Sequence, residues 1–224
     1  MFEQYFDTKT TTNEQFIVDS ILEHTMIDEE ELYLLKNMLS GLCEGKHEDI
    51  EQFRDKILSI RNDSNHIFEH LEEQIIQANF DFQKQYDFLR IFQRVECISS
   101  EIFRCANYIT IFVRLNGSLP TFCNEDLQSL INCNLEAHEF LKKSLMLYEK
   151  NKQDVFSSIH KVVSIKHSIH TIYFNAVETI YRLSNEGSLK LGDMRSIENI
   201  FSSLVNIGDS VESASTSLEW LLIT

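Results

Sequence analysis

Residues 84–115 read KQYDFLRIFQRVECISSEIFRCANYITIFVRL, and apolar residues recur in this stretch at alternating steps of three and four. The positions are Phe88, Ile91, Val95, Ile98, Ile102, Cys105, Ile109 and Phe112. This heptad spacing is typical of a helix that packs nearly parallel to long neighbours with a left-handed supercoil. The stretch therefore predicts a long helix in a bundle.

The end of the chain carries the same spacing over residues 197–221. Its positions are Ile197, Ile200, Leu204, Ile207, Val211, Ala214, Leu218 and Leu221. The whole chain contains one Pro and six Gly, too few for the many turns of an all-β fold. Breaks are expected at 41–46, 79–83, 116–123, 150–153 and 185–192. We therefore predict an all-α fold whose first helix begins at a capping box made by Thr11 and Glu14.

Two parts of the chain are similar to each other in order and spacing. Ser59-Ile60-Arg61 matches Ser164-Ile165-Lys166 at an offset of 105 residues (61 to 166). At an offset of 109 residues (92 to 201), four apolar residues match four others: Phe92, Val95, Ile98 and Ile102 match Phe201, Leu204, Ile207 and Val211. Chance similarity between amphipathic helices is the alternative explanation. The near-constant offset favours a duplication, with a single domain over 1–224 and halves at 12–116 and 123–224.

Charge and composition exclude several classes of protein. A formal net charge of −15 and a pI near 4.9 disfavour nucleic acid as a partner. No apolar run approaches the ~20 residues of a membrane span, and residues 1–12 are too polar for a secretory signal, so we expect a cytoplasmic protein. The five cysteines form no CxxC pair and are expected to be reduced, with Cys97 and Cys105 in the core.

Several polar patterns could bind a metal, but each has a simpler interpretation. The segment His66-Ile67-Phe68-Glu69-His70 fits the HxxEH pattern of one zinc protease class, although no third ligand follows at a catalytic spacing. His167 with His170, and His138 between Glu136 and Glu139, are most simply surface residues. The acidic runs 28–31 and 69–73 are interpreted as solvated helix faces. Because no phosphate loop or Ser-His-Asp order is present, we do not expect an enzyme.

Four charged residues lie on or beside the predicted apolar faces. Lys166 interrupts an apolar ladder that runs from Val155 to Ile180, and Arg61 is its counterpart in the first half. Glu96 and Asp209 flank the two heptad faces. An unpaired charge at such a position costs several kcal/mol, so opposite charges on neighbouring helices should meet. The alternative is that the long side chains extend to water.

The same segments resemble a known family. Leu204-Val205-Asn206-Ile207-Gly208-Asp209 and, more faintly, the segment 95–100 resemble the LERIGD-type signature of PhoU-like phosphate-uptake regulators. The segments 60–65 and 165–170 occupy the place of that family's other acidic motif. The resemblance covers nearly the whole chain and is closest to the single-chain branch associated with Pit-type phosphate permeases. It implies two three-helix bundles of long antiparallel helices, and multinuclear iron or zinc held by acidic pairs.

This chain departs from the family's acidic pattern at most of its positions. Residues other than acids stand at Arg61, Asn65, Ser100, Lys166, His170 and Val205, and only Glu96 and Asp209 remain acidic. Two acids cannot neutralise a cluster of cations, so we expect no cofactor, with Glu96, Asp209 and His170 as residual metal candidates. We hypothesise that the ion pairs Arg61–Glu96 and Lys166–Asp209 replace the metal bridges.

The resemblance implies a function in phosphate regulation. We expect a non-enzymatic cytoplasmic regulator or accessory protein of inorganic phosphate transport, which contacts a phosphate permease or a phosphate-signalling protein. The alternative is a helical scaffold or a metal-binding bundle with an unrelated partner. Apolar helix faces often pair between copies, so a homodimer is expected, and the C-terminal run 220–223 is expected to be buried.

Overall fold

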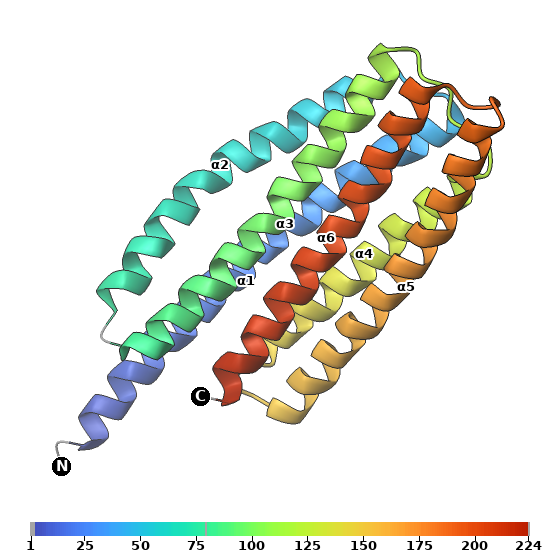
Figure 1. Cartoon of the computed structure of the whole chain (residues 1–224). Helices are drawn as coiled ribbons and strands as arrows, with labels where there is room; N and C mark the ends of the chain where they lie inside the picture. The colour runs from blue at the N-terminus through green and yellow to red at the C-terminus, as the bar shows by residue number, and fades with distance from the viewer. Residues whose placement is uncertain (1–2, 79, 224) are drawn as a thin grey trace.

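The computed structural model is built from long helices (Figure 1). It describes residues 3–78 and 80–223, with the side chains of all but 3–13 and 65–69. The helices are α1 (Glu3–Glu44), α2 (Ile50–Gln77), α3 (Phe82–Arg114), α4 (Cys123–Met146), α5 (Lys152–Asn185) and α6 (Leu191–Ile223). No strand occurs in these described ranges, which confirms the predicted all-α class. Each break expected from the sequence overlaps a connection between helices, although the first, expected at 41–46, begins inside α1, which ends at Glu44.

The helices form two sets of three that lie side by side. Helices α1, α2 and α3 all contact one another, and so do α4, α5 and α6. The two sets meet through α3 against α6 and α1 against α4, whereas α2 and α5 make no contact with each other in the described residues. Figure 1 accordingly shows α2 and α5 on opposite outer edges of the molecule. The predicted duplication fits this arrangement but stays a prediction.

The core follows the two heptad faces. All eight positions predicted on α3 are at most 1% exposed, and all eight on α6 are buried. The expected burial of residues 220–223 is correct for Leu221 and Leu222 but wrong for Trp220 and Ile223, which are 55% and 64% exposed. A helix has 3.6 residues per turn, so four consecutive residues cannot all face one neighbour.

The start of the first helix differs from the prediction. Helix α1 begins at Glu3, eight residues before the expected capping box at Thr11. Residues 3–12 contain no Gly or Pro, so nothing in them stops the helix from extending toward the N-terminus. The helix also runs without a break through Thr25, whose hydroxyl donates to the Ile21 carbonyl oxygen at 2.8 Å.

All five cysteines are free thiols, and the two on α3 differ in burial. Cys105 lies in the core as expected, but Cys97 is exposed. The reason is register, because Cys97 falls between the heptad positions Val95 and Ile98 and so turns to solvent. Across the described ranges, no helix combines the length and the apolar character needed to span a membrane.

Candidate functional site

The first charged cluster joins the three helices of the N-terminal set. Arg61 on α2 places its Nη2 atom 3.6 Å from Oε1 of Glu96 on α3, and the same nitrogen donates to the Ser100 hydroxyl at 2.8 Å. The other Glu96 oxygen lies 3.2 Å from Nε2 of His24 on α1, a fully buried side chain. The guanidinium group also lies over the Phe103 ring, 5.5 Å from its centroid. Glu96 therefore has a nitrogen partner on each side.

The second cluster is built in the same way between α5 and α6. Lys166 places Nζ 3.5 Å from Oδ1 of Asp209 and 3.1 Å from Oε2 of Glu212. His170, one turn further along α5, brings Nε2 to 2.8 Å from the same Asp209 oxygen. Burial lowers the pKa of Lys166, but its hydrogen bond to Glu212 and the nearby carboxylates outweigh this and leave the pKa above its ordinary value. Lys166 is therefore a fixed cation.

The structure thus brings together both pairs that the sequence singled out. In each set a cation from the middle helix lies about 3.5–3.6 Å from an acid on the third helix. Sequence reasoning missed two partners, Glu212 and His24. Glu212 lies three residues after Asp209, and residues at this spacing share a helix face, so the signal was present.

These positions do not fit a multinuclear metal centre. Such clusters need several carboxylates that bridge the ions, yet a guanidinium and an ammonium group stand beside the two remaining acids. Among the side chains that the structure describes, no group of three or more His, Cys, Asp and Glu residues is placed to hold a metal ion. The replacement of metal by fixed cations stays our hypothesis.

A pair of acids on α1 is fully buried beside the first cluster. Asp28 and Glu31 are both 0% exposed, and none of their four carboxyl oxygens has a hydrogen-bond partner in the described part of the chain. Burial raises the pKa of Glu31 to about 8, and burial, with the charges of Glu31 and Glu96, raises that of Asp28 well above its ordinary value. Glu31 is therefore mostly protonated at pH 7, and burial favours the neutral form of Asp28 as well.

The interpretation of run 28–31 as a solvated face is thus wrong for Asp28 and Glu31. A continuous ladder of alternating three- and four-residue steps runs along α1 and passes through polar residues. It consists of Ile17, Ile21, His24, Asp28, Glu31, Leu35, Met38 and Leu42, all of them buried. The intervening Glu30 is exposed. The four acids are adjacent in the sequence and so resemble one exposed run, although only Asp28 and Glu31 lie on the inner face of the helix.

His138 on α4 is a second residue whose environment was predicted wrongly. Its side chain is fully buried, and neither ring nitrogen has a hydrogen-bond partner within the described residues. Burial, and then the charge of Lys142, lower its pKa to about 4, so the ring is neutral. Lys142 itself extends outward and donates to both Glu29 oxygens at 2.8 and 2.9 Å, which joins α4 to α1. The surface interpretation fails because α4 packs against α1 as well as α5 and α6.

The zinc-protease pattern is only partly visible. The side chains of His66 and Glu69 lie outside the described residues, as does that of Asn65. His70 is exposed, and its Nε2 lies 2.9 Å from the amide nitrogen of Gln74. His167 is also exposed, in agreement with its interpretation as a surface residue.

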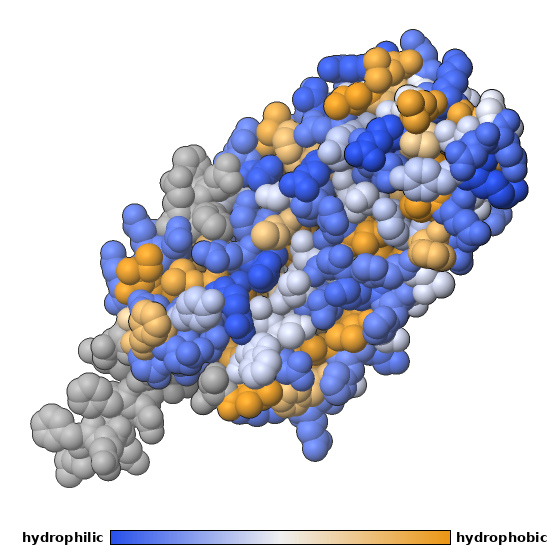
Figure 2. All heavy atoms as spheres, in the orientation of Figure 1, coloured by the Kyte–Doolittle hydropathy of each residue, from blue (hydrophilic) through white to orange (hydrophobic). Residues whose placement is uncertain are grey.

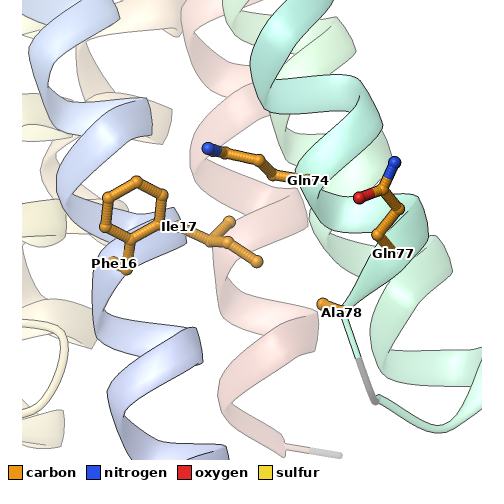
Figure 3. A pocket seen from close by; sticks show the side chains of 5 residues that line it. All are labelled: Phe16, Ile17, Gln74, Gln77 and Ala78. Carbon is orange, nitrogen blue, oxygen red and sulfur yellow. The ribbon is translucent and has the colours of Figure 1, made fainter.

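A shallow pocket of about 260 Å³ lies between α1 and the end of α2 (Figure 3). Figure 3 shows Gln74 extending from α2 toward α1, with Phe16 and Ile17 on the facing helix. Amide and apolar side chains line this pocket, and none of them titrates. It therefore offers shape but no acid or base for chemistry.

We expect the Arg61→Met substitution to lower the free energy of unfolding by about 1–3 kcal/mol, because it leaves the mostly buried Glu96 with one partner fewer. A double variant that adds Glu96→Gln to Arg61→Met should recover part of the lost free energy of unfolding, because the acid left without its partner is then removed. Urea unfolding of the two single variants and the double variant measures this coupling. Arg104→Met is the matched control, because Arg104 is 52% exposed and pairs with Glu101 on its own helix, and an equal loss there would contradict the pairing.

Comparison with solved structures finds several chains of the same architecture, among them two from Shewanella oneidensis MR-1. One, described as a PhoU-like phosphate regulatory protein, is 14% identical, with a TM-score of 0.77. The other, described as a PhoU-like protein, is 12% identical, with a TM-score of 0.78. Each alignment covers 92% of this chain and 99% of the other. No protein-family model matches the chain, and comparison with curated proteins also finds no match. Over nearly its whole length, this chain has the PhoU-like fold.

Proposed function

We propose that this protein is a non-enzymatic regulator of inorganic phosphate transport. The observation that carries the proposal is the match of fold over 92% of the chain to a protein described as a PhoU-like phosphate regulatory protein. At 14% identity this likeness gives the fold alone, and the function is our inference from it. We further propose that the protein works in the cytoplasm and acts by contact with a phosphate permease or a phosphate-signalling protein.

The ionisable groups support a role without catalysis. In the second cluster, Lys166 is held by two carboxylates and keeps its proton, so it is not a general base. Burial raises the pKa of both Asp28 and Glu31, but both side chains are 0% exposed and so are not open to a substrate. These groups are placed to hold helices together rather than to act on a substrate.

The surface is compatible with a regulated, reversible contact. Figure 2 shows apolar residues in separate groups among polar ones on the face in view. On the outer helix α5, Phe174 and Tyr181 lie two turns apart and are both exposed. Interfaces that form and separate are about as polar as the rest of a protein surface, so a continuous apolar face is not required.

Deletion of the gene tests the proposal directly. We expect altered phosphate uptake and altered expression of phosphate-responsive genes, both restored by the intact gene. A variant with Phe174→Ser and Tyr181→Ser should restore less than one with Ser substitutions at the exposed residues Met26 and Tyr33 of α1. Unchanged uptake and unchanged expression in the deletion strain would contradict the proposal.

The alternative is a helical scaffold for an unrelated partner. Affinity purification of the intact chain distinguishes the two, because recovery of a partner unconnected with phosphate would favour the scaffold. A metal-binding bundle is the weaker alternative, since the donor set at the two clusters does not fit a metal centre. The homodimer stays a prediction that light scattering can check.

A further inference from the structure

A second pocket lies between α3 and α6, at the contact of the two helix sets. It is open to solvent and measures about 230 Å³. Arg90 and Arg94 of α3 line one side, and α6 contributes Ser213, Thr216, Ser217 and Trp220. Residues four apart on a helix share one face, so the two guanidinium groups belong to the same side of α3. Two arginines and three hydroxyl groups thus surround one hollow.

The two arginines differ in their partners. Arg90 Nη2 lies 3.6 Å from Oδ1 of the buried Asp87, the same distance as in the Arg61–Glu96 pair, and its guanidinium group lies over the Tyr86 ring, 5.9 Å from the centroid. Two Arg90 nitrogens, Nε and Nη2, are buried without a hydrogen-bond partner in the described part of the structure. Arg94 is exposed and makes no ion pair with any described residue. The guanidinium donors of Arg94 are therefore open to a ligand, whereas Arg90 is shared with Asp87.

The acid that lines the pocket, Glu212, pairs with Lys166, which also pairs with Asp209. Its Oε2 atom lies 3.1 Å from Nζ of Lys166, and its Oε1 atom accepts from the Thr216 hydroxyl at 3.3 Å. The Ser217 hydroxyl donates to the Ser213 carbonyl oxygen at 2.8 Å, whereas the Ser213 hydroxyl makes no hydrogen bond within the described residues. The pocket therefore combines the guanidinium group of Arg94, which has no ion pair among the described residues, with the Asp87-paired guanidinium group of Arg90 and one free hydroxyl donor.

A pocket lined by two arginines is unusual in a chain with a net charge of −15. Planar guanidinium groups bind tetrahedral oxyanions through two parallel hydrogen bonds, and paired arginines favour them over simple anions. We propose that the α3–α6 pocket binds a small phosphate-class oxyanion, either inorganic phosphate or a phosphate monoester. The proposal rests on the pocket alone and goes beyond the regulatory function proposed above.

The chain contains a single tryptophan, and Trp220 lines this pocket, so its fluorescence reports on binding. The experiment titrates the full chain with inorganic phosphate at constant ionic strength, with fluorescence and calorimetry as readouts. In a second arm, glycerol phosphate replaces inorganic phosphate. Saturable binding is expected in at least one arm, and the tighter ligand identifies the source of the anion. Equal weak responses to phosphate and to chloride would overturn the proposal.

Substitutions then place the binding at the pocket. Arg94→Gln changes an exposed side chain, so it should leave the fold intact while it weakens binding by roughly tenfold or more. Arg90→Gln should have a similar effect. Arg104→Gln on the same helix is the matched control, because Arg104 pairs with Glu101 away from the pocket. An affinity unchanged by Arg94→Gln, or reduced equally by Arg104→Gln, would overturn the site.

Discussion

Replacing Glu31 with glutamine is expected to stabilise the protein strongly above pH 8 and to leave it nearly unchanged at pH 5. The pKa of Glu31 is about 8 in the folded chain, compared with 4.5 as its ordinary value, because burial disfavours the charged form. The charges of Glu96 and Glu30 raise this pKa further, whereas the neighbouring Ser99 hydroxyl and then the charge of Arg61 act in the opposite direction. At neutral pH the folded state thus holds a proton that the unfolded state releases.

The sign of the pH dependence follows from this difference. Between pH 4.5 and about 8 the folded chain binds more protons at Glu31 than the unfolded chain does, so stability falls as the pH rises. Each unit of difference in pKa is worth about 1.4 kcal/mol, so the loss amounts to several kcal/mol above pH 8. His138 acts in the opposite direction at lower pH, because its pKa of about 4 in the folded chain makes stability rise between pH 4 and 6.5.

Urea unfolding at a series of pH values from 5 to 9 measures the effect. The wild-type chain should lose stability mainly between pH 6.5 and about 8, where His138 no longer opposes the effect of Glu31, whereas Glu31→Gln should lose clearly less. Glu30→Gln is the matched control, since that neighbouring acid is exposed. Similar profiles for the two variants, or a wild-type stability that does not fall above pH 6.5, would show that Glu31 is not the titrating group.

Ile102→Ala in the centre of α3 is expected to cost about 2–5 kcal/mol of unfolding free energy. Ile102 is completely buried on the heptad face, and the bundle relaxes only partly around the missing atoms. Ile111→Ala on the same helix is the control, because this isoleucine is 48% exposed and should cost less than about 1 kcal/mol. Chemical unfolding followed by circular dichroism compares the two. Equal losses would mean that the heptad face is not the core.

The sequence predicted the fold well because the heptad pattern is a property of packing itself. The apolar rows that contain Ile102 on α3 and Leu218 on α6 have the spacing of a helix that packs along a long neighbour, and no other architecture buries such a row. The start of α1 could not be predicted in the same way. A capping box marks a position at which a helix can begin, but a preceding segment that contains no Gly or Pro can extend the helix toward the N-terminus.

The candidate site was predictable only where a charge interrupts an apolar ladder. Lys166 was noticeable because the remaining positions of its ladder on α5 are apolar, and the structure places it beside Asp209 and Glu212. Asp28 and Glu31 lie on an equivalent ladder, but Glu29 and Glu30 between them made the whole segment resemble a surface. The α3–α6 pocket had no signal in the sequence, because Arg90 and Ser213 meet only through tertiary packing.

The lack of contact between α2 and α5 in the described residues has a consequence for local opening. Either helix can separate from its own two neighbours while α1, α3, α4 and α6 remain packed. Amide hydrogens of α2 and α5 should therefore exchange with solvent as two independent groups. A substitution that loosens one outer helix should leave the exchange rates of the other unchanged.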